Sequence, residues 1–128
     1  MKSNLLKNNK NLIIMNIYVS LPITGRPIAE ARNHADLVKT ALSKQGHRVT
    51  TPFDVFAGAN PGWEDYITAD VNVAMTSDTV YFCDGWERSP GCRLEMNAVT
   101  EVNNHRIAVG EGGKLINVVF ETPERKWR

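Results

Sequence analysis

Two carboxylates interrupt the apolar faces of two predicted helices. Residues 62–76 carry apolar side chains at helical spacing, and Asp70 stands on that face. Glu95 is the one charged position on the corresponding face of residues 90–104. Desolvating a carboxylate without a partner costs several kcal/mol, so each side chain must either meet a cation or line a ligand pocket.

Glu95 is the candidate nucleophile of this pair. It lies in the second turn of its predicted helix, where the helix dipole favours the ionised form. An ionised carboxylate beside the anomeric carbon of a sugar can attack that carbon. The structural alternative is that Asp70 or Glu95 pairs with an internal cation such as Arg32 or Arg93.

A second candidate site is the turn in "NIYVSLPITGRP", residues 16–27. A hydrophobic strand runs there into a turn with Gly25 and Arg26, and Pro27 opens the next helix. Strand, tight turn and helix N-terminus together favour an anion site, because free backbone N–H groups and the helix dipole point at the ligand. The alternative is an ordinary strand-to-helix connection with a solvated arginine.

The elements that must position these residues alternate along the chain. Helices are predicted from Pro27 to a stop at Gly46, over 62–76 and over 90–104; strands are predicted over 12–20, 47–53, 78–84, 105–109 and 115–120. This order predicts a three-layer α/β fold with a mainly parallel, five-stranded sheet. The link before the last strand is short enough to allow an antiparallel edge. In the first helix, the predicted core positions are Ala31, Ala35, Val38 and Leu42.

Length and composition indicate one ordinary globular domain. The 128 residues are 42% hydrophobic and 23% charged, with a formal net charge of +1, which gives no reason to expect binding of a nucleic acid polymer. We expect one domain over 12–122 between a disordered tail, 1–11, and a polar tail, 123–128. Met15, directly before the first strand, is an alternative start of translation.

The cysteines and the hydropathy pattern indicate the cellular compartment and the absence of a membrane segment. Cys83 and Cys92 lack the spacing of metal ligands, and a cysteine inside a buried strand is typical of a reduced cytoplasmic protein. No run reaches the length of a membrane helix, so no membrane partner is expected. We also expect no metal site.

Two stretches carry a family resemblance, "IYVSLPITG" and "DYITADVNVAMTSDTVYFCDGWERSPGCRLEMNAV". Over about residues 14–110 the chain resembles the nucleoside 2-deoxyribosyltransferase-like superfamily, in particular its DUF4406 branch. The resemblance implies a flavodoxin-like or Rossmann-like fold, a nucleoside or nucleotide as small-molecule partner, and a homo-oligomer. It implies cleavage of an N-glycosidic bond without a cofactor, with transfer of the sugar to another base or to water.

The resemblance also assigns roles to individual residues. Glu95 matches the nucleophile, Asp70 the residue that contacts the sugar or orients the nucleophile, and Tyr18 the tyrosine that positions the carboxylate. Leu21 stands where many relatives have glycine, which predicts a crowded pocket. The expected substrate-binding residues are Ser20, Pro22, Gly25, Arg26, Asp84, Ser89 and Gly91, with Arg26 at a 5′-phosphate.

Two other classes of function remain open at this point. One is a nucleotide-binding module without catalysis, which would keep the anion site at Arg26. The other is a structural or interaction domain, for which no nucleotide would raise the melting temperature.

Overall fold

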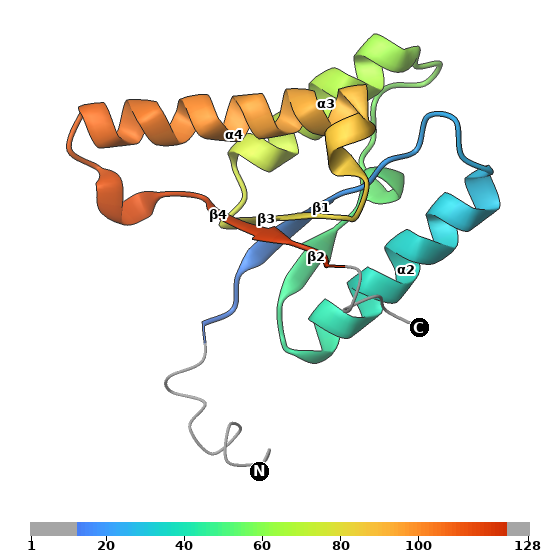
Figure 1. Ribbon diagram of the computed structural model, residues 1–128, viewed down its shortest axis with the longest axis horizontal. Coiled ribbons are helices and arrows are strands. Elements are labelled where there is room, and N and C mark those ends of the chain that lie inside the picture. The colour runs from blue at the N-terminus through green and yellow to red at the C-terminus, as the bar shows by residue number, and fades with distance from the viewer. Residues whose placement is uncertain (1–12, 123–128) are drawn as a thin grey trace.

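The computed structural model describes residues 13–122 and contains a four-stranded sheet with three α-helices (Figure 1). The tails predicted at 1–11 and 123–128 lie outside the described residues. The strands are β1 (Asn16–Ser20), β2 (Arg48–Thr50), β3 (Thr79–Phe82) and β4 (Asn117–Phe120). The helices are α2 (Ile28–Lys44), α3 (Trp63–Met75) and α4 (Pro90–Ala108), with short 3-10 turns η2 (Pro52–Asp54), η3 (Trp86–Arg88) and η4 (Gly112–Lys114).

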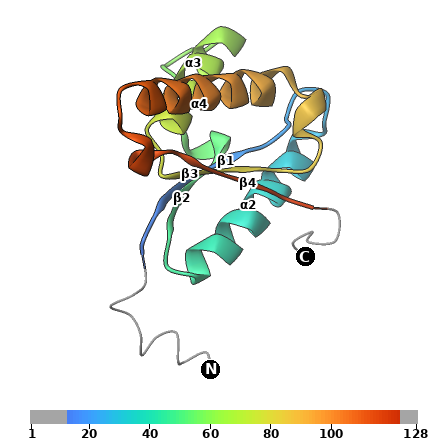
Figure 2. The ribbon, with the colours of Figure 1, turned by 60° about the vertical axis from the view of Figure 1, so that its left-hand side comes forward.

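All strand pairs are parallel, in the order β2-β1-β3-β4. Helix α2 covers one face of the sheet and helices α3 and α4 cover the other, as the two views in Figures 1 and 2 show. The predicted α/β class with a parallel sheet is therefore confirmed. Because every strand runs the same way, the carboxyl ends of all four meet at one edge, where ligands bind in such folds.

Alternation along β1 divides the core into two clusters. Ile17, Val19 and Leu21 pack with α2, including its predicted core positions Ala31, Ala35, Val38 and Leu42. Tyr18 instead belongs to the cluster beneath α3 and α4. Adjacent strand residues point to opposite faces, so Leu21 packs on the α2 side of the sheet and Tyr18 on the side of α3 and α4.

The predicted strand over 105–109 is wrong, because α4 continues to Ala108. No glycine or proline interrupts this stretch before Gly110, whose φ of +85° lets the chain leave the helix. A longer α4 also explains the direction of β4, since a full helical crossover brings the chain back parallel to β3. The sheet consequently has four strands, not five, and its last strand is not antiparallel.

The apolar faces of α3 and α4 are only partly buried. Asp70, Ala74, Glu95 and Val99 are buried, as their spacing predicts, whereas Trp63, Tyr66 and Leu94 of the same predicted faces remain about half exposed. The first turn of α3 borders a cleft instead of the sheet, which leaves its aromatic side chains accessible. Exposed aromatic residues beside a cleft are available to a ligand.

The membrane and cysteine predictions can be compared with the structure. Within residues 13–122, no helix combines the length and apolar character that crossing a membrane requires. Cys83 and Cys92 are both buried free thiols.

Candidate active site

Glu95 is held at the carboxyl end of β1 by two hydroxyl groups. Ser89 caps the start of α4 by accepting the backbone N–H of Cys92 at 3.3 Å, and Glu95 follows in the second turn. Tyr18 donates its phenolic hydrogen to Glu95 Oε2 at 2.9 Å, and Ser20 donates to Oε1 at 2.6 Å. Tyr18 and Ser20 are two residues apart on β1, so their side chains point to the same face of the sheet, toward α4. Each carboxylate oxygen thus has one fixed donor.

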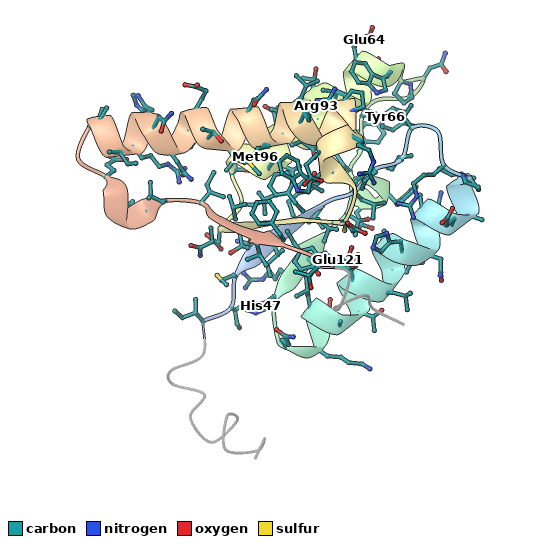
Figure 3. All side chains as sticks on the ribbon, in the orientation of Figure 1. His47, Glu64, Tyr66, Arg93, Met96 and Glu121 are labelled. Carbon is teal, nitrogen blue, oxygen red and sulfur yellow. The ribbon has the colours of Figure 1, made fainter. Side chains whose placement is uncertain are left out.

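The ion pairs considered from the sequence do not form. Arg93, labelled in Figure 3, donates to the backbone oxygen of Glu87 at 2.9 Å. The Arg32 guanidinium lies over the Phe53 ring, 4.4 Å from its centroid. Among the described residues, the side-chain hydrogen bonds to Glu95 come from hydroxyl groups and no ion pair reaches it.

Asp70 is the second buried carboxylate of this site. Its Oδ1 has no hydrogen-bond partner within residues 13–122, although the residue is only 7% exposed. Burial, followed by the charge of Glu95, raises the pKa of Asp70 to about 7. Burial raises the pKa of Glu95 to about 7 as well, against the hydrogen bonds from Ser20 and Tyr18, which lower it. The pair therefore changes protonation near neutral pH.

The hydroxyl of Tyr18 remains a donor throughout this range. Burial, and after it the charge of Glu95, raises its pKa well above the ordinary value of tyrosine. The phenol is therefore protonated near neutral pH, where Glu95 changes its protonation.

A cleft with a volume of about 430 Å³ opens next to this pair. Its wall combines the aromatic residues of η2 and α3 with the start of α4, and includes Phe53, Trp63, Tyr66, Ile67, Asp70 and Gly91. Gly91 lies one turn before Glu95, and a Cβ at that position would stand 2.9 Å from Ile67 Cδ1. Glu95 itself is 3% exposed and lies behind this wall, not on it.

A second cavity, of about 460 Å³, adjoins the cleft. Thr24 and Ser89 border both spaces, and the other lining residues include Pro22, Arg26, His34, Asp84 and Arg88. Gly25 makes the turn, with a φ of +85°, but lines neither space. The predicted substrate-binding residues are thus divided: Gly91 borders the cleft, Pro22, Arg26 and Asp84 border the cavity, Ser89 borders both, and Ser20 supports Glu95 from behind.

Sequence reasoning missed two residues here: His34 of α2, which lines the cavity, and Glu121 directly after β4, which lies behind His34. His34 Nε2 lies 3.0 Å from Glu121 Oε1, and His34 Nδ1 lies 3.4 and 3.5 Å from the two terminal nitrogens of Arg26. The side chain of Glu121 is fully buried and also accepts the backbone N–H of Asp84 at 2.9 Å. An acidic residue at the end of an apolar strand was the available signal for Glu121.

The same region brings three ligand types of metal sites together. In the part of the chain that the structure describes, ligand atoms of His34, Cys83 and Glu121 lie within 4.8 Å of one another. Arg26 can only donate, so His34 Nδ1 accepts and the ring hydrogen belongs on Nε2. Burial also raises the pKa of the Cys83 thiol well above its ordinary value. In this arrangement His34 and Glu121 are members of a hydrogen-bonded chain that ends on Arg26.

Comparison with known proteins gives a family without a described activity. No curated protein matches the chain. A family model described as "Domain of unknown function (DUF4406)" matches residues 15–107, a span that contains Tyr18, Asp70 and Glu95. The match covers most of the chain, from the start of β1 nearly to the end of α4, so the chain belongs to the DUF4406 family.

Proposed function

We propose that this protein cleaves the N-glycosidic bond of a nucleoside or nucleotide, with Glu95 as the nucleophile. The observation that carries the proposal is a buried glutamate held by Tyr18 and Ser20, without an ion pair among the described residues, next to the unpartnered oxygen of Asp70. Such an arrangement is costly for folding and useful for chemistry. The resemblance to nucleoside 2-deoxyribosyltransferases supports the same reaction class.

In the first step, a carboxylate oxygen of Glu95 bonds to the anomeric carbon as the bond from that carbon to the base breaks. The base leaves with the bonding electron pair. Water or a second base then attacks the anomeric carbon and releases Glu95, which gives hydrolysis or transfer respectively. Tyr18 and Ser20 hold the attacking carboxylate in one orientation through both steps.

The hydrogen bonds from Tyr18 and Ser20 favour the ionised form of the nucleophile Glu95 over the ionised form of Asp70. Two carboxylates with raised pKa values this close together do not both ionise easily, so the pair retains a proton. Glu95 accepts two hydroxyl hydrogen bonds, which stabilise its charge, whereas Oδ1 of Asp70 accepts none within residues 13–122. The retained proton therefore belongs on Asp70, which can then orient the sugar or the attacking group.

The substrate fits across the two adjoining spaces. The base lies in the aromatic cleft, where Trp63 and Tyr66 offer ring faces, and the sugar lies at Asp70. A 5′-phosphate then reaches Arg26 in the neighbouring cavity. The end of the Ile67 side chain lies against Gly91, one turn before Glu95, so we place the ligand's path to Glu95 past Ile67.

The test is incubation with a panel of nucleosides and 5′-monophosphates, with and without an acceptor base. Free base alone indicates hydrolysis, and an exchanged base indicates transfer. Glu95→Gln should reduce either product by several orders of magnitude while ligand binding persists. Glu101→Gln, an exposed position on the same helix, is the matched control and should keep full activity. Normal turnover by Glu95→Gln would contradict the proposal.

One observation favours a second candidate function, a nucleotide-binding module without catalysis. Glu95 is almost fully buried and does not line the cleft. In that case a nucleotide raises the melting temperature of the protein but stays intact through prolonged incubation, and Glu95→Gln leaves its affinity unchanged.

A further inference from the structure

A chain of polar contacts runs from the buried end of β4 to the wall of the second cavity. Its members come from three separate segments: Glu121 after β4, His34 in the middle of α2, and Arg26 in the turn after β1. Figure 3 labels Glu121, where the chain leaves the sheet beside α2. His34 and Glu121 are 87 residues apart in the sequence.

The direction of each hydrogen bond in this chain follows from the chemistry of its members. Arginine has no acceptor, so Arg26 donates to His34 Nδ1. A neutral imidazole that accepts at Nδ1 carries its hydrogen on Nε2. This hydrogen points at the Glu121 carboxylate, whose Oε1 lies 3.0 Å from His34 Nε2. The buried carboxylate thus selects the tautomer of His34 that can accept from Arg26.

The other contacts of Arg26 do not fix its guanidinium group equally well. Its side chain donates to the backbone oxygen of Pro22 at 2.9 Å, and its contact with the exposed carboxylate of Glu30 is long, 3.8 Å. An exposed i,i+4 ion pair of this kind contributes little to holding a side chain. His34 is held by Glu121 through its Nε2 atom, and its Nδ1 atom restricts the position of Nη2, the second terminal nitrogen of Arg26.

We propose that His34, oriented by Glu121, is a positioning residue that holds Arg26 for the phosphate group of a nucleoside 5′-monophosphate. The inference rests on the proposed function, because it assigns the phosphorylated ligand to the cavity beside the proposed catalytic cleft. A guanidinium fixed before binding loses less side-chain entropy when the anion arrives, so monophosphates gain affinity over nucleosides. The effect passes through Arg26 alone.

The test compares binding of a nucleoside 5′-monophosphate, its parent nucleoside and inorganic phosphate by titration calorimetry. His34→Leu removes both hydrogen bonds of the ring. We expect about a fivefold weaker binding of the monophosphate and of inorganic phosphate, the size of one hydrogen bond, and an unchanged nucleoside affinity. His34→Asn, which is too short to join both partners, should give the same loss if the leucine variant folds poorly. Thr40→Leu, at an exposed position of α2, is the control.

The decisive measurement is a double-variant cycle with Arg26→Ala. If His34 acts through Arg26, His34→Leu has no further effect once the arginine is absent. Additive losses, or an equal loss for the nucleoside, would overturn the role of His34 and leave the proposed reaction intact. If Arg26→Ala itself does not weaken either phosphate probe, the phosphate cavity is wrong, while loss of base release in Glu95→Gln still tests the reaction separately.

Discussion

Glu95 and Glu121 are both buried glutamates near the carboxyl ends of parallel strands, yet they have different surroundings. Glu95 accepts hydrogen bonds from the two hydroxyls of Tyr18 and Ser20. Glu121 accepts from an imidazole and a backbone N–H, and its chain of contacts ends on the cation of Arg26. Under the proposed function, burial alone does not make a carboxylate reactive, and the two glutamates differ in the donors that surround them.

The contrast has an energetic consequence. Around Glu95 the protein keeps a carboxylate whose charged form is destabilised by burial, with a pKa near 7. Around Glu121 it joins a carboxylate to a cation through a histidine, which stabilises the connection between β4 and α2. We therefore expect substitutions at the first position to affect chemistry and pH dependence, and substitutions at the second to affect stability.

The largest expected effect is on the pH dependence of stability at Glu95. Its pKa is raised by folding, so between about pH 4.5 and 7 the folded state binds more protons than the unfolded state, and the free energy of unfolding falls as the pH rises. In Glu95→Gln the free energy of unfolding should not show this fall, which amounts to up to about 3 kcal/mol in the wild type. The variant should therefore be more stable than the wild type above pH 7. Denaturant unfolding at several pH values measures it. A variant that is less stable at pH 8 would mean that Glu95 is a structural residue.

At Glu121 we expect the opposite response. Glu121→Ala leaves the ring N–H of His34 and the backbone N–H of Asp84 without this acceptor, so the free energy of unfolding should fall by about 2 kcal/mol at neutral pH. Chemical denaturation beside Glu30→Ala, an exposed carboxylate near the same arginine, provides the comparison. Equal stability of both variants would remove the distinction between the two glutamates.

Tyr18→Phe should shift the pH profile of the proposed reaction. The tyrosine hydroxyl lowers the pKa of Glu95, so its removal moves this pKa above 7. Because the nucleophile must be ionised, activity rises with pH through the pKa of Glu95, and the rise should move upward by about one unit, equivalent to about 1.4 kcal/mol. A profile of kcat/KM against pH measures this. A loss that is the same at every pH would argue that Tyr18 contacts the substrate instead.

The smallest effect is expected at the part of the cleft wall that Gly91 and Ile67 form. A Cβ at Gly91 would meet only the mobile end of Ile67, so Gly91→Ala should change stability by less than about 1 kcal/mol. The displaced Ile67 narrows the path to Glu95, so KM should rise a few-fold. Gly113→Ala, with nothing within 4 Å of the added atom, is the control. An unchanged KM would show that ligands reach Glu95 by another route.

Local patterns predicted much of the framework. Helical spacing identified the buried residues of α2 and singled out Asp70 and Glu95, and the alternation of elements predicted a parallel α/β sheet. The error at 105–109 has a local cause too, since a short segment with few breakers suits the end of a helix as well as an edge strand. Half-exposed Trp63 shows that an apolar spacing does not distinguish a core face from a cleft wall.

By itself, the sequence determined which side chains share a helix or strand face, because that depends only on residues a few positions apart. It therefore marked Glu95 as an anomaly but left its partners open. The tertiary structure decided that Tyr18 and Ser20, 77 and 75 residues away, hold this carboxylate, and that Arg32 and Arg93 do not. It likewise joined His34 to Glu121. The physical reason is that the order of parallel strands brings distant strand ends together, and no local periodicity encodes that order.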